Sequence, residues 1–262
     1  MDDKEKVVKL LNDAKKERNS ENRILYFGKK LQDIPSEAHS LEEGEEEHLV
    51  VNLHGFDCVT FVETVIAFTL CDIHEKRTFE DFCKFLTLIR YREGILTDYT
   101  SRLHYFTWWA EDNEKKGILK DITIDDEPFT EEKNMEFNYM SSHPDYYKHL
   151  KNHPEFIPII KNYEEKSNRK YRYIPKQNLS GDKNSSLNII HDGDIVGMVT
   201  DKKGLDISHV GFTFWKNDKL HLMHLSFIEN KVMINEETLY DYEMNHPNHL
   251  GIKVFRLVDN EN

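Results

Sequence analysis

The segment from Asn52 to Thr64, which reads NLHGFDCVTFVET, places a cysteine where a polar loop gives way to an apolar helical pattern. Asp57 is a residue type that caps helix N-termini. Apolar residues follow it with helical spacing, at Val59, Val62, Val65 and Ile66. We therefore expect a helix from Cys58 to about Leu70. Because a helix N-terminus favours negative charge, this position should lower the pKa of the Cys58 thiol and make it a nucleophile. A small buried core residue is the plainer interpretation of a free cysteine.

The composition limits the kinds of partner that this chain can bind. Its 262 residues suffice for one large domain, and its formal net charge is −13. This negative charge argues against nucleic acid and against an anionic membrane surface as partners. No apolar run reaches the roughly 18 residues of a membrane span. The charged start, MDDKEK, lacks the apolar segment of a signal peptide.

The three cysteines do not suggest a disulfide framework, because their number is small and odd. Cys71 lies near the end of the helix that starts at Cys58, and Cys83 follows the helical spacing of its apolar neighbours. We therefore expect both to be core residues.

Helical periodicity dominates the first part of the chain and strand patterning the last part. Helices are expected at 2–17, 21–33, 58–70, 78–91, 101–116 (capped by Ser101) and 154–170. Strands are expected at 194–200, 207–215, 220–227 and 251–258, with a short one near 231–235. The pattern predicts a single α+β domain over 1–262, in which a helical half (about 1–175) packs on an antiparallel sheet (about 190–258).

Two histidines in neighbouring strands complete a possible catalytic group. A two-residue Asn217-Asp218 turn would pair Lys216 with Lys219, and this register places Gly211 opposite His224. His209 and His224 then share one face as diagonal neighbours, which suits a base and its orienting partner beside a thiol.

A zinc site made by Cys58, His209 and His224 is the alternative chemistry for these residues. However, the closely spaced ligand pairs of common zinc motifs are absent. A phosphate-binding glycine loop is also absent. We expect neither a metal nor a cofactor.

Four segments together resemble the N-acetylmuramoyl-L-alanine amidase-like branch of the papain-like NlpC cell-wall hydrolases. They read DCVTFVET (57–64), RYREG (90–94), SRLHYF (101–106) and GLDISHVG (204–211). The resemblance implies a papain-like fold with Cys58 as nucleophile, His209 as base and His224 as third residue. It also implies action in the bacterial cell envelope or periplasm. One departure is His224-Leu225-Ser226, where the family tends to have His-Ala-Ser.

The residues predict a cysteine amidohydrolase, and the resemblance implies that it cleaves the N-acetylmuramoyl-L-alanine amide of peptidoglycan fragments. We expect three residues to contact the substrate: Asp57, Arg102 and Ser208. The guanidinium group of Arg102 suits a substrate carboxylate. Arg90 is a weaker candidate, because it could equally form an ion pair on a helix surface. Two alternatives remain open: an endopeptidase that cuts the stem peptide after γ-D-glutamate, and a non-catalytic module that binds the envelope.

Overall fold

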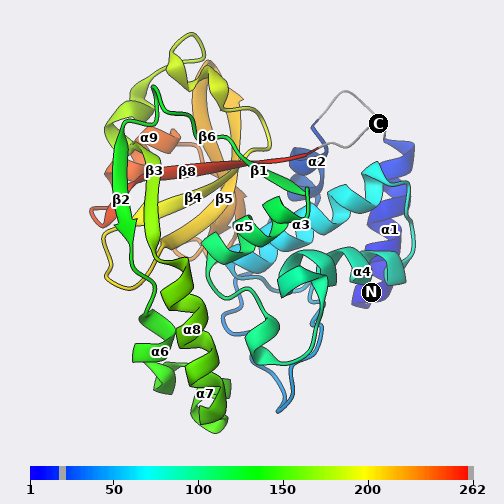
Figure 1. The fold of residues 1–262 in the computed structure, drawn as a ribbon. Helices are drawn as coiled ribbons and strands as arrows, with labels where there is room; N and C mark the ends of the chain where they lie inside the picture. The colour runs from blue at the N-terminus through cyan, green and yellow to red at the C-terminus, as the bar shows by residue number, and fades with distance from the viewer. Residues whose placement is uncertain (18–21, 259–262) are drawn as a thin grey trace.

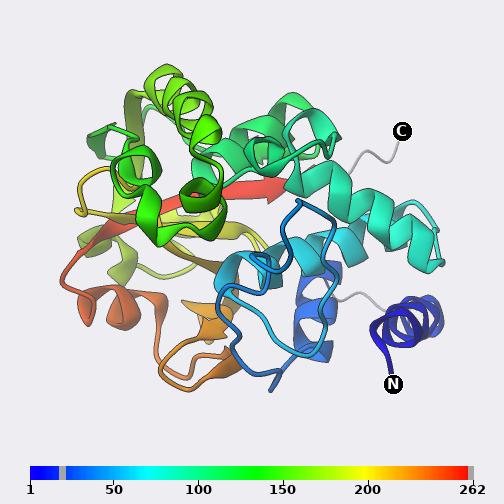
Figure 2. The same cartoon turned by 90° about the horizontal axis from the view of Figure 1, so that it is seen from below.

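The computed structural model describes residues 1–17 and 22–258, in which a group of helices packs against a large antiparallel sheet (Figure 1). Among the described residues, five α-helices precede the first strand: α1 (Asp3–Lys16), α2 (Arg23–Lys30), α3 (Cys58–Ile73), α4 (Phe79–Arg90) and α5 (Phe106–Lys115). Figure 2 shows these helices gathered on one side of the molecule, with the chain's N-terminus on the outer helix α1.

The described residues contribute eight strands to the sheet. They are β1 (Leu119–Asp121), β2 (Glu131–Met135), β3 (Arg169–Pro175), β4 (Ile195–Thr200), β5 (Ile207–Lys216), β6 (Lys219–Ser226), β7 (Lys231–Ile234) and β8 (His249–Leu257). Their order is β2-β3-β8-β4-β5-β6-β7, and β1 also pairs with β8. The last strand of the chain therefore lies inside the sheet, between β3 and β4.

Shorter helices cover the rest of the sheet. The elements α6 (Tyr139–Ser142), α7 (Lys148–Asn152) and α8 (Ile157–Ser167) form a lobe next to β2 and β3, at the bottom of Figure 1. The helix α9 (Leu239–Met244) connects β7 with β8. Its residues Leu239 and Tyr242 share a second apolar cluster with Val196 and Leu222. This cluster is distinct from the one that α3 joins, so α9 covers the other face of the sheet.

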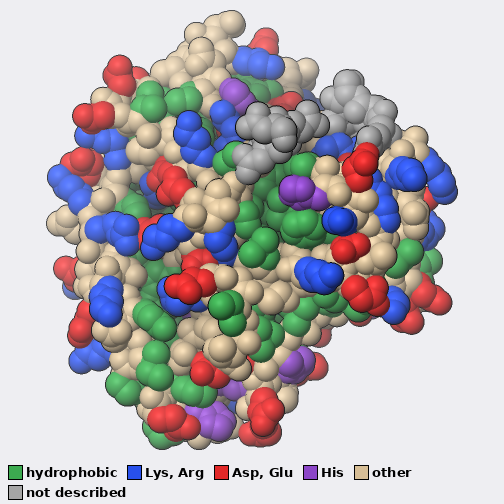
Figure 3. All heavy atoms as spheres, turned by 45° about the vertical axis from the view of Figure 1, so that its right-hand side comes forward, with side chains coloured by type: hydrophobic (Ala, Val, Ile, Leu, Met, Phe, Trp, Pro, Cys, Tyr) green, Lys and Arg blue, Asp and Glu red, His purple; other side chains and the backbone are tan. Residues whose placement is uncertain are grey.

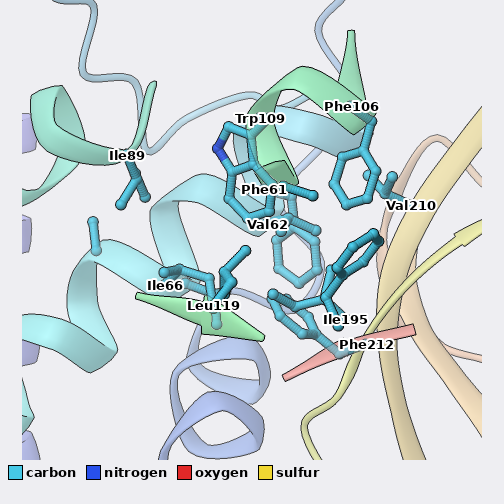
Figure 4. Packing of buried hydrophobic residues seen from close by; sticks show 14 of the residues in the cluster. Phe61, Val62, Ile66, Ile89, Phe106, Trp109, Leu119, Ile195, Val210 and Phe212 are labelled. Atoms are coloured by element: carbon cyan, nitrogen blue, oxygen red, sulfur yellow. The ribbon is translucent and has the colours of Figure 1, made fainter. Parts of the chain in front are cut away.

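The main apolar core lies between α3, α5 and the strands. Phe61 and Val62 of α3 point toward Val210 and Phe212 of β5 (Figure 4). The rings of Phe61 and Phe212 are 5.8 Å apart and nearly perpendicular, which is a favourable aromatic geometry. Full burial of a phenylalanine contributes about 1.5–3 kcal/mol, so these contacts hold the start of α3 firmly against β5.

The hairpin register that the sequence predicts is confirmed. Lys216 pairs with Lys219, and Thr213 pairs with Leu222. Asn217 and Asp218 have φ values of 50° and 60°, as the two central residues of a tight hairpin turn require. The short strand predicted near 231–235 is present as β7.

Other parts of the prediction differ from the structure. The strands β1 to β3 lie within the region expected to be helical, and α8 ends at Ser167, where β3 follows almost at once. Ser101 does not cap a long helix: it ends a short 3-10 turn, and α5 begins only at Phe106. These strands are short and pair with distant segments, so local periodicity does not reveal them.

No described helix combines the length and apolar character needed to cross a membrane. Figure 3 shows acidic and basic side chains interspersed with apolar ones over one face of the molecule.

Candidate active site

The N-terminus of α3 presents Cys58 next to the sheet. The Asp57 carboxylate accepts a hydrogen bond from the backbone N–H of Thr60 at 2.7 Å, and the Thr60 hydroxyl accepts one from the Asp57 N–H at 2.9 Å. This reciprocal capping box confirms Asp57 as the N-cap. Cys58 is thus the first residue of the helix and remains partly exposed, so a substrate can reach it.

The environment of the thiol corrects one expectation from the sequence. Burial and, to a lesser degree, the nearby Asp57 carboxylate raise the pKa of Cys58 to about 12. The backbone N–H groups of Val210, Cys58 and Val59 lower this pKa, as expected for a helix N-terminus, but by less. The predicted lowering is therefore wrong, because desolvation outweighs the favourable N–H groups.

His209 and His224 stand side by side, as the hairpin register predicts. Nε2 of His209 lies 2.7 Å from Nδ1 of His224, and the two rings are nearly perpendicular. Both side chains are buried, with exposed fractions of 7% and 2%. Gly211, opposite His224, leaves room for this contact: a Cβ atom there would lie 3.0 Å from the His224 Cβ.

The Cys58 thiol lies beside the same strand, since the N–H that reaches it belongs to Val210, which directly follows His209. Among the described residues, no hydrogen bond joins the Cys58 thiol to a ring nitrogen of His209. Nδ1 of His209 also has no hydrogen-bond partner in the described part of the chain. The nitrogen that could serve the thiol is therefore free.

Asn235 is a site residue that the sequence does not reveal. Its side-chain Oδ1 lies 3.0 Å from Nε2 of His224, and its backbone N–H donates to Leu222 across β6. Asn235 directly follows β7, so its position depends on the pairing of β6 with β7. The sequence pattern predicts the strand, but it does not distinguish Asn235 from other polar residues near the end of that strand.

Burial keeps both histidines neutral at neutral pH. It lowers the pKa of His209 well below the ordinary histidine value, and the neighbouring His224 lowers it further. Burial also lowers the pKa of His224 to about 4, although the Asn235 contact acts in the opposite direction. At rest the site therefore holds a neutral thiol beside two neutral imidazoles.

Tyr242 of α9 covers these histidines from the other side. Its ring centroid is 5.3 Å from that of His224 and 6.3 Å from that of His209. His246 stacks on Tyr242 and on His249, which contacts the buried carboxylate of Glu243 at 3.0 Å. No sequence pattern links these residues to the site.

A cleft lies between the start of α3 and the segment 38–42. Its lining includes Asp57 and Val59, Glu42 and Arg102, and Phe227 after β6. The cleft lies directly beside Cys58, because its lining residues Asp57 and Val59 flank that cysteine in the chain.

The predicted substrate-contact residues occupy different surroundings. Arg102 lines the cleft, but its guanidinium group already pairs with Glu42 at 2.6 Å and Glu47 at 3.5 Å. Asp57 also lines the cleft, although one carboxylate oxygen serves the helix cap. Ser208 is exposed and donates to the Met198 carbonyl. Since strand residues alternate, its side chain leaves β5 on the face opposite His209.

Arg90 does not form the surface ion pair that the sequence suggested. Its Nε lies 2.7 Å from Oε2 of Glu63, and both side chains are only 3% exposed. A second nitrogen of Arg90 donates to the Val50 carbonyl. The pair thus ties α4 to α3 inside the protein.

Within residues 1–17 and 22–258, no three His, Cys, Asp or Glu side chains gather in an arrangement that could hold a metal ion.

Comparison with known proteins shows which family shares this architecture. A sequence model of the AmiA-like family, described as N-acetylmuramoyl-L-alanine amidase-like, matches residues 26–252. No curated protein matches the chain significantly.

Solved structures share both the fold and part of the sequence. A crystal structure of an N-acetylmuramoyl-L-alanine amidase from Bacteroides uniformis is 37% identical, with a TM-score of 0.84 over 90% of this chain and 97% of that one. A provisionally named xylanase from Bacteroides fragilis is 36% identical, with a TM-score of 0.81 over 88% of this chain and 99% of that one. A Legionella pneumophila protein, 24% identical, has the same fold with a TM-score of 0.72 over 97% of this chain and 94% of that one.

The family match covers most of the chain and agrees with the similarity to the Bacteroides uniformis amidase. The chain therefore belongs to the AmiA-like family of N-acetylmuramoyl-L-alanine amidase-like cell-wall hydrolases.

Proposed function

We propose that this protein is a papain-like cysteine amidohydrolase of the NlpC type, which cleaves the amide between the lactyl group of N-acetylmuramic acid and L-alanine. The observation that carries the proposal is the 2.7 Å contact between His209 and His224 beside a helix-terminal cysteine. We propose that its substrates are peptidoglycan fragments and that it acts in the bacterial cell envelope or periplasm.

The hydrogen bonds support one arrangement of the ring protons. The Asn235 Oδ1 can only accept, so Nε2 of His224 carries a proton. A neutral His224 has one ring proton, so its Nδ1 accepts from Nε2–H of His209. Nδ1 of a neutral His209 is then the unprotonated nitrogen, available as a base.

In the first half of the reaction, Nδ1 of His209 takes the thiol proton as Sγ of Cys58 attacks the lactyl carbonyl carbon. The resulting oxyanion needs hydrogen-bond donors, and the N–H of Cys58 at the helix start is a candidate. His209, now an imidazolium, is stabilised by the neutral Nδ1 of His224. It then protonates the leaving nitrogen, so the C–N bond breaks and the peptide departs with a free alanine amine.

In the second half, a water molecule attacks the thioester while Nδ1 of His209 accepts its proton. The thiolate of Cys58 leaves and regains that proton from His209, and N-acetylmuramic acid is released with a free lactyl carboxylate. The thiol proton thus leaves with the alanine amine and a water proton replaces it on Cys58, so the enzyme is regenerated and water is the only further reagent.

Incubation with N-acetylmuramoyl tripeptide and with the free tripeptide tests this proposal. The amidase reaction releases intact tripeptide with a new alanine amino terminus and leaves the free tripeptide unchanged. Release of an L-Ala–γ-D-Glu dipeptide from either compound would establish the endopeptidase alternative. No cleavage of either compound, with Cys58 no more reactive than an ordinary thiol, would favour a non-catalytic module.

A further inference from the structure

A cavity of about 630 Å³ lies in the lobe of short helices next to β2 and β3, at the bottom of Figure 1. It is lined by residues of β2, α6, α8 and the start of β3, and its volume is within the range of small-molecule sites, roughly 300–1,000 Å³. Three strands lie between β2 and β5 in the sheet, so roughly 19 Å separates β2 from the strand of His209. The cavity is therefore separate from the cleft beside Cys58.

Glu164 of α8 brings a carboxylate with an unpartnered oxygen to the lining of this cavity, although the residue is only 1% exposed. Its Oε1 accepts hydrogen bonds from the Tyr105 hydroxyl at 2.6 Å and from the backbone N–H groups of Met140 and Ser141 at 3.1 and 3.2 Å. Its Oε2 is buried and has no hydrogen-bond partner among the described residues. Because a buried acceptor without a donor destabilises a protein, we expect Oε2 to accept from a molecule that enters the cavity.

Other polar groups of the lining are also available to a ligand. Oδ1 of Asn168 accepts from the backbone N–H of Phe137 at 2.8 Å, which leaves its Nδ2 without a partner in the described part of the chain. The side chains of Asn134 and Ser142 line the cavity too and make no hydrogen bond with any described residue. A sugar hydroxyl can donate to a carboxylate and accept from an amide, so this set of groups suits a ligand rich in hydroxyls.

The charges around the cavity balance, which favours a neutral ligand. The lining holds three cationic side chains and three carboxylates: Lys161, Arg169, Lys170, Glu136, Glu164 and Glu165. Arg169 and Lys170 pair with carboxylates outside the lining, so neither is free to bind an anion. An anionic ligand would therefore meet the buried Glu164 carboxylate with little compensation. The buried side chains of Met135 and Phe137 add apolar surface, which suits the carbon face of a sugar ring.

We propose that this cavity is a second binding site, which takes a neutral saccharide. A sugar hydroxyl donates to Oε2 of Glu164, and another sugar oxygen accepts from Nδ2 of Asn168. A site of this kind anchors the protein to a glycan, whichever bond is cut in the cleft beside Cys58. Only the source of the saccharide, the N-acetylglucosamine of peptidoglycan, rests on the proposed function.

Calorimetric titration with N,N′-diacetylchitobiose, a neutral disaccharide of N-acetylglucosamine, tests this proposal. Glu164→Gln keeps an oxygen for the Tyr105 hydroxyl but replaces Oε2 with an amide nitrogen, so it should raise the dissociation constant at least about tenfold. Asn168→Asp removes the Nδ2 donor and should raise the constant at least about threefold, while kcat with N-acetylmuramoyl tripeptide stays unchanged. Asn162→Asp is the matched control: it makes the same change at an exposed residue of α8 outside the cavity lining, and it should leave the dissociation constant unchanged.

Two results would overturn the proposal. If the wild type does not bind the disaccharide, the cavity is no saccharide site, and Oε2 is left to an ordered water molecule. If neither Glu164→Gln nor Asn168→Asp weakens binding, the disaccharide binds elsewhere. Should Glu164→Gln fail to fold, Asn168→Asp decides alone, because it changes an exposed residue. The titration needs no turnover, so a protein that binds the disaccharide in this cavity but cleaves no substrate would lose only the proposed amidase function.

Discussion

Oδ1 of Asn235 lies 3.0 Å from Nε2 of His224, and this contact at the end of β7 determines which nitrogen of His209 is free to accept a proton. The two histidines and the asparagine form a chain of hydrogen bonds that ends at Nδ1 of His209. Asn235, two contacts away from the proposed base His209, thereby controls the tautomer of that histidine.

Asn235→Ala should lower kcat about two- to tenfold, because the lost hydrogen bond is worth about 0.5–1.5 kcal/mol and no longer fixes the His224 ring. Asn235→Asp keeps an acceptor oxygen and should retain more activity than the alanine variant. The two kcat values, measured with N-acetylmuramoyl tripeptide, test this order. An alanine variant as active as the wild type would remove Asn235 from the site.

His224 should set the acid limit of activity. When both rings are protonated their charges repel, which lowers the pKa of His209. His224→Asn removes this repulsion while its amide oxygen can still accept from Nε2–H of His209, so the pKa should rise and the acid limb of kcat/KM should move to higher pH. In the wild type this limb should lie below about pH 6.5, the ordinary histidine value. His209→Ala should cost about 10²–10⁴-fold, the usual contribution of a general base, and His224→Asn less. An unchanged acid limb in His224→Asn would contradict this coupling.

Cys58 should react slowly with alkylating agents at neutral pH, even though it is the proposed nucleophile. Burial raises its pKa to about 12, so the thiolate fraction grows steadily as pH rises. Iodoacetamide labelling of Cys58 across pH, in a Cys71→Ala/Cys83→Ser background, measures this directly. A rate that is already high and constant below about pH 7 would instead indicate a thiolate–imidazolium pair at rest.

Part of this site can be predicted from sequence because its determinants are local. The Asn217-Asp218 turn fixes the register of β5 and β6, and the register brings His209 to His224. Asp57 signals the helix start by its capping chemistry alone.

The remaining features depend on contacts between distant segments. Asn235 reaches His224 only through the pairing of β7 with β6, and β3 pairs with β8 far along the chain. The pKa of Cys58 follows from tertiary burial, which reverses the local effect of the helix N-terminus. Turn and cap patterns carry no information on such burial.

Arg90 should matter for stability rather than for substrate affinity. Breaking a buried ion pair leaves an uncompensated charge, so Arg90→Met should lower the free energy of unfolding by about 3–5 kcal/mol. The double variant Arg90→Met/Glu63→Leu should recover much of this loss, because neither charge remains buried. Urea denaturation of the three proteins gives these values. A stable Arg90→Met with a raised KM would restore Arg90 as a substrate contact.

Gly211 should be required for the contact between the two histidines. A Cβ atom at this position would lie 2.8 Å from the Met223 carbonyl oxygen and 3.0 Å from the His224 Cβ, so either β6 or the His224 side chain must shift. Such overpacking typically costs about 1–3 kcal/mol, and here it also displaces the ring that orients His209. Gly211→Ala should therefore lower both stability and kcat.

Gly197→Ala is the matched control: its Cβ would crowd Phe106 and Ile207 in the core at 3.1 and 3.2 Å, away from the histidines. It should lower the free energy of unfolding while largely preserving kcat at a temperature where the protein is folded. Equal kcat values for the two variants would show that the site tolerates a shift of His224, and that Gly211 serves packing alone.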